Sequence, residues 1–254
     1  MKIIWSIASA TYREIIRERL LYGIFLIAAL ITGASFFLST ISFDQNVRVL
    51  QDIGLASIHV LTLFITVFVA TNSLSRDVDR RALYFLFPKP VSRMHYVLGK
   101  YVGFILFMIT TLVILGGLFS VGLAVIDTHV LLAAGINIMY SFLEISLLLA
   151  LATLFASFTA PLNASLYTLA IYFVGHSQSS LRTFVAQLNN GFLNAVIKTV
   201  YYVLPNLEKF DVRKATLYQV PIPHSQVFWT LIYWALYLAI ALYLAVLVTK
   251  KREL

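Results

Sequence analysis

The sequence contains no cysteine, and this absence excludes several chemistries at once. A chain without thiols forms no disulfide, zinc–thiolate centre or iron–sulfur cluster, and it has no cysteine nucleophile. Two catalytic motifs are missing as well: the G-x-x-x-x-G-K-[ST] phosphate-binding loop and the G-x-S-x-G nucleophile elbow. The chain therefore cannot hydrolyse ATP through a phosphate-binding loop of its own.

Charged residues are also scarce. Asp, Glu, Lys and Arg make up 12% of the 254 residues, about half of their usual share in a soluble domain, whereas 60% of the residues are apolar. This composition excludes a disordered chain, which has low hydrophobicity and high net charge. A soluble domain of this length could not bury so much apolar surface, so we expect a membrane-embedded protein.

Continuous apolar stretches predict how the chain crosses the membrane. A spanning helix needs about 20 mostly apolar residues, and six stretches qualify, at 21–40, 54–74, 98–126, 130–155, 161–176 and 227–248. The apolar runs are continuous rather than alternating, which disfavours a β-barrel. We therefore predict an all-α fold in which residues 1–254 form a single polytopic transmembrane domain.

Residues 1–19 have the pattern of an amphipathic helix rather than of a signal peptide. The apolar stretch 3–7 is too short for a signal-peptide core. Apolar side chains recur at helical spacing and charged ones occupy the opposite side: Ile4, Ile7, Ala8, Tyr12, Ile15 and Ile16 against Arg13, Glu14, Arg17 and Glu18. We expect this helix to lie in the membrane interface, with Trp5 at the depth of the lipid headgroups.

The basic residues predict the orientation. Thirteen of the 19 Lys and Arg fall on the side that carries both termini, and cytoplasmic loops are the ones enriched in Lys and Arg. We therefore expect a multi-pass protein of the cytoplasmic (inner) membrane with both termini in the cytoplasm. Five acids on the same side leave a net charge of +8, which is the whole formal charge. No basic surplus remains for a nucleic-acid-binding domain, so nucleic acid is not an expected partner.

The predicted cytoplasmic loop 75–97 joins the second and third spans. Its first half is compatible with a short helix in which charged residues are followed by an aromatic run that ends at Phe87, and Pro88 and Pro90 then stop any helix. Composition leaves two interpretations open. The helix either docks on a cytoplasmic protein, since Tyr, Phe and Arg are typical of interfaces, or it is an interfacial anchor that holds the two spans.

The segment 177–226 is predicted on the outer side. After a turn at 189–191, apolar residues of one helical face follow over 193–204, and Pro205 ends the run. We expect an amphipathic helix that lies on the outer leaflet, dips partway into it as a re-entrant element, or caps a pathway.

Glu144 is the one clear acid deep in a predicted span, and Asn137 lies on the same helical face. Because a charge at the bilayer centre costs about 2.5–3.5 kcal/mol, Glu144 is expected to face the bundle interior or to be protonated. These two residues are the candidate intramembrane polar site. They form either part of a translocation path or an interhelical hydrogen bond with Tyr140 or another hydroxyl. The five histidines show no metal-binding spacing, so no metal site is expected.

Three stretches of the chain resemble the type-2 ABC transporter permease family. The most specific is Arg81-Ala-Leu-Tyr-Phe-Leu-Phe-Pro-Lys-Pro-Val-Ser-Arg93 followed by Leu98-Gly99-Lys100-Tyr101, which is similar to the cytoplasmic loop of that family. Asp79 and Arg81 match its acidic and basic positions, whereas Ala82 and Pro88 stand where hydroxyl residues are frequent. The other two stretches are Leu154-Phe-Ala-Ser-Phe-Thr-Ala-Pro161 with Gly175-His176, and Leu204-Pro-Asn-Leu207.

The resemblance implies a six-helix permease subunit that dimerises with a copy of itself or with a related permease and sits on cytoplasmic ABC ATPase subunits. Residues 1–19 correspond to the elbow helix near the ATPase, with Tyr12, Arg13, Glu14 and Arg17 as the residues concerned. The residues that match the family's coupling helix, and so contact the ATPase, are Asp77, Asp79, Arg80, Arg81, Leu83, Tyr84 and Phe87. The remaining expected partner is the lipid bilayer. An extracytoplasmic accessory protein is a further candidate partner.

The implied function is transport, most simply export, driven by ATP hydrolysis in the partner. ATP and Mg²⁺ then bind to the partner, and this chain has no catalytic residue and no cofactor. An ion-coupled secondary transporter without an ATPase is the alternative, followed by an intramembrane enzyme or an assembly scaffold. Spans rich in Leu, Ile and Phe favour a hydrophobic or amphipathic cargo over a small ion in a wet pore.

Overall fold

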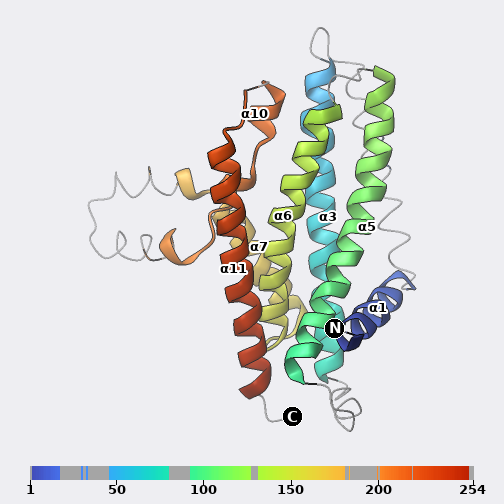
Figure 1. Cartoon of the computed structure of the whole chain (residues 1–254), viewed down its shortest axis with the longest axis vertical. Coiled ribbons are helices and arrows are strands. Elements are labelled where there is room, and N and C mark those ends of the chain that lie inside the picture. The colour runs from blue at the N-terminus through green and yellow to red at the C-terminus, as the bar shows by residue number, and fades with distance from the viewer. Residues whose placement is uncertain are drawn as a thin grey trace.

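A computed structural model describes residues 2–17, 30, 33, 46–79, 92–126, 131–180, 183, 199, 201–218 and 220–251. Every regular element within these ranges is a helix, which confirms the predicted all-α class for this part of the chain. The elements are α1 (Lys2–Ile16), α3 (Asn46–Asp79), α5 (Arg93–Ile126), α6 (Leu131–Ala156), α7 (Pro161–Gly175), the 3₁₀ helix η2 (Leu207–Phe210), α10 (Arg213–Leu217) and α11 (His224–Lys251) (Figure 1).

Four of the described helices are long and apolar enough to cross a membrane. The qualifying stretches are Leu50–Arg76 in α3, Arg93–Val121 in α5, Leu131–Ala156 in α6 and His224–Lys250 in α11. They coincide with the predicted spans at 54–74, 98–126, 130–155 and 227–248. The coarse prediction, a helical chain with several candidate membrane spans, is therefore confirmed.

The other two predicted spans have a different status. Over 161–176 the structure has α7, which is 15 residues long. At 1.5 Å per residue α7 covers about 22 Å, less than the hydrocarbon core of about 30 Å. The predicted span 21–40 lies outside the described residues except for Leu30 and Gly33. Six crossings therefore stay a prediction.

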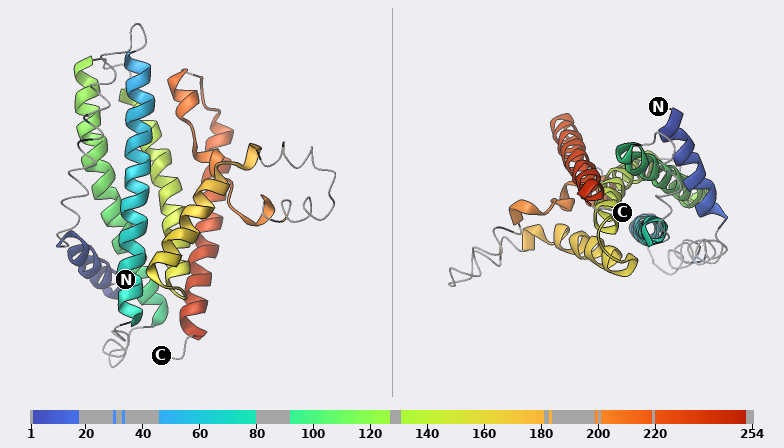
Figure 2. Two further views of the ribbon diagram at one scale, coloured as in Figure 1. Left: turned by 180° about the vertical axis from the view of Figure 1, so that it is seen from behind. Right: turned by 90° about the horizontal axis from the view of Figure 1, so that it is seen from below.

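Helix α6 is the centre of the bundle. It packs against α3, α5, α7 and α11, and the view along the bundle shows it between α3 and α5 on one side and α7 and α11 on the other (Figure 2). Residues 143–150 of α6 are all buried, as expected of a helix that is surrounded on every side. A polar residue in this stretch, such as Glu144, must therefore find its contacts inside the protein.

Helices α3 and α5 both continue past the stretches that a bilayer needs. Each has 34 residues, which corresponds to about 51 Å. Both ends of the predicted loop 75–97 are helical, because α3 ends at Asp79 and α5 begins at Arg93. The sequence prediction ended the spans where polarity changes, but charged side chains are compatible with a helix that continues into water.

Helix α1 lies across α5 near one end of the bundle (Figure 1). Two glycines of α5 leave room for it: a Cβ on Gly103 would stand 2.9 Å from the backbone oxygen of Ala8, and one on Gly99 would stand 2.7 Å from the Cβ of Ile7. With α1 so close, Tyr12 Oη and Thr110 Oγ1 form a hydrogen bond of 3.0 Å.

The exposure pattern of α1 agrees with the predicted amphipathic helix. Ala8 and Ile15 of the predicted apolar side are buried, together with Thr11, and the charged side is exposed at Arg13, Glu14 and Arg17. Trp5 is 61% exposed, so it is free to meet lipid headgroups. The assignment of α1 as an elbow helix stays a prediction.

Candidate functional site

Helix α1, the end of α3, the start of α5 and the end of α11 lie at the same end of the bundle (Figure 1). This is the arrangement expected if the termini and the loop between the second and third spans share one side of a membrane. Asp77 and Asp79 belong to the last turn of α3. The other residues that match a coupling helix, Arg80, Arg81, Leu83, Tyr84 and Phe87, lie outside the described residues.

The described residues of the 81–101 stretch hold this end of the bundle together. Ser92 precedes α5, and its Oγ accepts a hydrogen bond of 3.3 Å from the backbone N–H of His95, which is the contact of an N-cap serine. Arg93 donates from Nη1 to the backbone oxygens of Thr249 at 2.6 Å and Lys250 at 2.8 Å. Arg93 thereby satisfies carbonyl groups at the end of α11, which lack partners within their own helix.

Lys100 connects three helices at the same end. Its ammonium group, on α5, lies 3.6 Å from the Glu14 carboxylate of α1 and donates to Ser73 Oγ of α3 at 3.3 Å. Lys100 is only 5% exposed, so its ammonium group is surrounded by protein. Glu14, predicted to lie near an ATPase, therefore has a contact within the chain.

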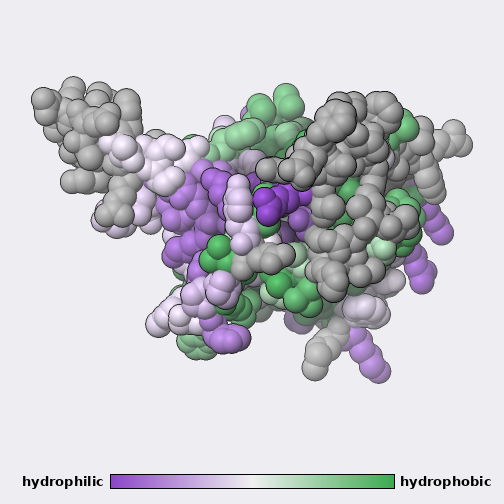
Figure 3. All heavy atoms as spheres, turned by 90° about the horizontal axis from the view of Figure 1, so that it is seen from above, coloured by the Kyte–Doolittle hydropathy of each residue, from purple (hydrophilic) through white to green (hydrophobic). Residues whose placement is uncertain are grey.

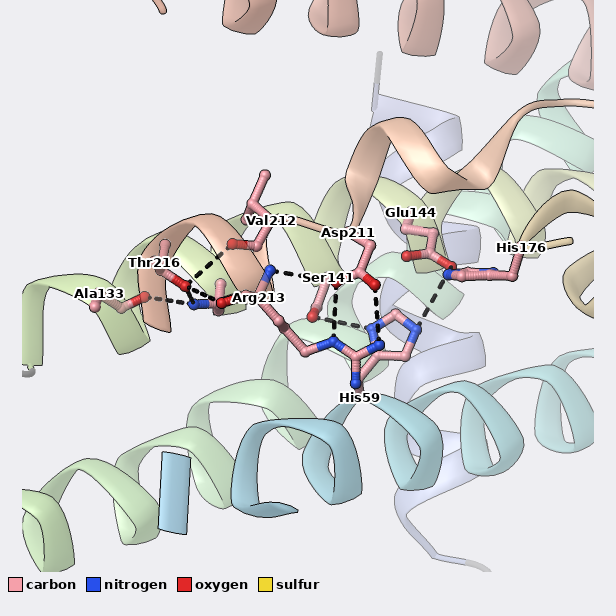
Figure 4. A network of polar contacts seen from close by, with 10 residues as sticks. His59, Ala133, Ser141, Glu144, His176, Asp211, Val212, Arg213 and Thr216 are labelled. Carbon is pink, nitrogen blue, oxygen red and sulfur yellow. Dashed lines mark hydrogen bonds and ion pairs between the residues drawn. The ribbon is translucent and has the colours of Figure 1, made fainter. Parts of the chain in front are cut away.

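The second candidate site surrounds Glu144, in the middle of α6. Glu144 is about 18–20 Å along the helix from either end and is 2% exposed. Its Oε1 lies 3.5 Å from Nε2 of His59, on α3, and 3.4 Å from Nε2 of His176, which follows α7 (Figure 4). Three ionisable side chains from separate segments therefore meet inside the bundle.

The far nitrogens of both imidazoles are also engaged. His59 Nδ1 is 3.0 Å from Ser141 Oγ, and His176 Nδ1 is 3.2 Å from the backbone oxygen of Tyr172. Such contacts fix the orientation of each ring, so that both Nε2 atoms point to the same carboxyl oxygen.

An ion pair completes the polar lining. Arg213 Nε is 3.0 Å from Asp211 Oδ1, and its Nη2 is 3.3 Å from Oδ2. Burial alone would raise the pKa of Asp211, but its hydrogen bonds with Arg213 and the charge of that residue outweigh burial and lower the pKa below the ordinary value. Together with Glu144 and the two histidines, the pair lines a small cavity that also includes Asn137, Ser141 and Phe210.

The sequence predicted Glu144 and Asn137 as the polar site, and the structure brings both to this cavity. It does not pair them: Asn137 Nδ2 donates to the backbone oxygen of Ala133 at 2.8 Å and to Thr216 Oγ1 at 2.6 Å. Of the expected hydroxyl partners, Tyr140 has no hydrogen-bond partner among the described residues, whereas Asn137 does bond another hydroxyl, that of Thr216 on α10. Glu144 faces two imidazoles instead.

Sequence reasoning missed His59, His176, Asp211 and Arg213 as members of one site. Two of the stretches that resemble the permease family contain or adjoin some of these residues: the one with Gly175-His176 and the Leu204-Pro-Asn-Leu207 stretch. Gly175, next to His176, packs against the 204–207 stretch, and Leu207 and Phe210 are buried. The segment predicted on the outer side therefore folds back and brings Asp211 and Arg213 to Glu144.

A second small cavity lies between α3 and α10. It is lined by Gln51, Asp52, Leu55, Arg213, Thr216 and Leu217. Arg213 belongs to both cavities and therefore stands between the polar site and the α10 end of the bundle. Seen from that end, hydrophilic side chains gather among apolar ones (Figure 3).

The cluster can hold and pass protons, since it combines a carboxyl group with two imidazoles. Within the ranges that the structure describes, no group of three or more His, Asp or Glu is arranged to hold a metal ion. No protein-family model matches the chain, and no curated protein is similar to it at a significant level.

Proposed function

We propose that the chain is the transmembrane permease subunit of an ATP-binding cassette transporter, driven by a separate cytoplasmic ATPase and working most simply as an exporter. The observation that carries the proposal is the 81–101 stretch, whose order of residues resembles the coupling loop of type-2 permeases. The structure supports it through the residues of that stretch that are described: Ser92, Arg93, Gly99 and Lys100 each make a specific contact at one end of the bundle.

The contacts at this end suggest how force reaches the bundle. The loop joins α3 to α5, and Lys100 ties both helices to α1. Arg93 adds the end of α11. A displacement of the loop is therefore passed to four helices together rather than absorbed by one flexible segment.

In the proposed mechanism, ATP closes two partner ATPases and moves the docked loops. Helices α3 and α5 act as levers of about 51 Å, and the permease dimer changes between inward-open and outward-open states. Nucleotide shifts this equilibrium only if the two states differ in their contacts with the ATPase. Arg80 and Arg81 are the groups proposed to bind acidic residues of the ATPase, while Tyr84 and Phe87 fill a groove on it.

The test combines Arg81→Ala with Tyr84→Ala and measures co-purification of the ATPase in mild detergent and its rate of ATP hydrolysis. We expect both to fall by at least tenfold, because an arginine and an aromatic anchor carry much of the energy of a small interface. Lys214→Ala is the matched control, since Lys214 is an exposed basic residue on α10 at the opposite end. Unchanged co-purification and hydrolysis in the double variant contradict the proposal.

The cluster of Glu144, His59 and His176 favours a second candidate function, that of an ion-coupled carrier. Such carriers need several buried ionisable groups, and Glu144 has two imidazoles beside it. Transport that continues without ATP and stops when the ion gradient is removed would favour the carrier over the ATP-driven permease.

A further inference from the structure

The hydrogen bond of His176 determines which of its nitrogens carries a proton. Nδ1 lies 3.2 Å from the backbone oxygen of Tyr172, and a carbonyl oxygen only accepts. Nδ1 is therefore the protonated nitrogen. In the neutral ring Nε2 then carries a lone pair, and this lone pair faces the carboxyl group of Glu144.

Two acceptors in this position repel each other unless a proton lies between them. His176 Nε2 is 3.4 Å from Glu144 Oε1, and with an ionised carboxyl group and a neutral imidazole neither atom can donate. His59 Nε2 is 3.5 Å from the same oxygen. Neither that nitrogen nor Glu144 Oε1 has a hydrogen-bond partner among the described residues. Ser141 both donates and accepts, so its contact with His59 Nδ1 leaves His59 free to take either tautomer.

The burial of Glu144 and His59 is a second reason to expect a bound proton in this cluster. Glu144 is 2% exposed and His59 is 7% exposed, and an isolated ionised carboxyl group is strongly disfavoured in such surroundings. Asp211 and Arg213 neutralise each other, so the cluster has a net charge of −1 when Glu144 is ionised and both imidazoles are neutral. One proton removes that charge.

Among the residues that the structure describes, few other titratable groups surround Glu144. Tyr101 of α5 and Trp234 of α11 contact Ser146 rather than Glu144. Among the described residues, the titratable and charged groups around the carboxyl are His59 of α3, Tyr140 of α6 itself, Tyr172 and His176 of the α7 segment, Asp211 before α10 and Arg213 at the start of α10. The charge of Asp52, on α3, also acts on Arg213. The cavity has a volume of about 10 Å³, about enough for one water molecule, which suits a ligand no larger than an ion.

We propose that His59, Glu144 and His176 form a proton-binding site in the middle of the bundle and share one proton at neutral pH. The proton sits on Glu144 as a carboxylic acid or on one imidazole as an imidazolium ion, and it bridges Oε1 and an Nε2 atom. Arg213 lines both this cavity and the one between α3 and α10. This inference goes beyond the proposed function and does not depend on an ATPase partner.

The test uses the full chain in lipid nanodiscs without ATPase. Infrared spectroscopy reports the protonated carboxyl group of Glu144, and ¹⁵N NMR of labelled histidine distinguishes imidazolium from the neutral tautomers. At neutral pH we expect either a carboxylic-acid band that is lost in Glu144→Gln or an imidazolium signal that is lost in His59→Asn or His176→Asn. The exposed His224 provides the control, because His224→Asn should leave these signals unchanged.

A pH series of thermal stability gives a second readout in case a histidine variant fails to fold. Glu144→Gln mimics the protonated acid. The thermal stability of the wild type should depend on pH over the range in which the shared proton is released. Glu144→Gln should lack this dependence.

Two outcomes would overturn the proposal. One is an ionised Glu144 with both imidazoles neutral at pH 7. The other is a stoichiometric metal ion in the purified wild type that is lost in Glu144→Gln, since a metal would then take the place of the proton. Neither result bears on the ATPase partner or on the proposed function. In the same way, a failure of the ATPase to co-purify would not bear on the proton-binding site.

Discussion

Gly175 and Leu207 are packed so closely that there is no room for a side chain at position 175. A Cβ on Gly175 would stand 2.7 Å from Cγ of Leu207 and 2.9 Å from the backbone oxygen of Pro205. Contacts this short force neighbouring atoms to move. This glycine therefore lets the 205–207 turn reach the end of α7, next to His176.

The first prediction follows from that contact. Gly175→Ala should lower the free energy of unfolding by about 1–3 kcal/mol, as is typical of overpacking, and it should move His176 away from Glu144. The measurement is thermal unfolding in nanodiscs. Gly135→Ala is the control, because no atom lies within 4 Å of a Cβ placed there. Equal stability of Gly175→Ala and the wild type would contradict the close packing.

The contact between α1 and α5 gives a second prediction. Gly103→Ala places a Cβ 2.8 Å from Cβ of Thr11 and should push α1 away from α5. We expect faster hydrogen exchange in residues 2–16 and a loss of about 1–3 kcal/mol of stability. Gly117, on the same helix, has nothing within 4 Å of its Cβ position, so Gly117→Ala should be neutral or stabilising by about 0.5–1 kcal/mol. Similar behaviour of the two variants would argue against this packing.

Arg93 provides a third prediction. Its guanidinium donates to two carbonyl oxygens at the end of α11, and hydrogen bonds of a charged donor contribute about 1.5–3 kcal/mol. Arg93→Ala should therefore lower stability by about 1–2 kcal/mol and speed hydrogen exchange at 247–251. Lys214→Ala, at the other end, should change neither. If hydrogen exchange at the end of α11 is the same in Arg93→Ala as in the wild type, the contact between Arg93 and α11 contributes little.

The Asp211–Arg213 pair predicts a response to acid. The pKa of Asp211 is lowered in the folded state, so the pair stabilises the fold above the unfolded-state pKa of about 3.9. This stabilisation is lost as the pH falls through the lower pKa of the folded state. The side chains of Arg213 and Asp211 are 33% and 28% exposed, so we expect the pair to stabilise the fold by only about 0.5–1 kcal/mol. Thermal unfolding of Asp211→Asn and wild type should differ at pH 7 and converge at low pH. A constant difference across that range would contradict the assignment.

Much of the fold could be predicted from apolar runs alone. Four of the six predicted spans coincide with helices that are long and apolar enough to cross a membrane, because continuous hydrophobicity is a strong and local signal. The boundaries were less accurate. Helix α3 continues through Arg76 to Asp79, since a helix that leaves the membrane need not end where polarity changes.

The polar site was predictable only in part. Glu144 is conspicuous in an apolar span, and its burial was correctly expected. Its partners could not be identified from the sequence, because His59 and His176 lie far from it along the chain and only tertiary packing brings them together. Spacing rules detect sites within one helix, whereas this site depends on Gly175 and on the turn that ends in η2.

The proposed permease function depends on the binding of an ATPase to the 80–91 loop, and the absence of native cysteine allows a direct test. Tyr84→Cys introduces a single thiol, which can carry a short crosslinker in intact membranes. We predict a crosslinked product with a second protein that contains a phosphate-binding loop, and loss of that product when ATPase subunits are removed. Crosslinking to lipid alone, or no protein adduct while the ATPase is present, would contradict the central claim.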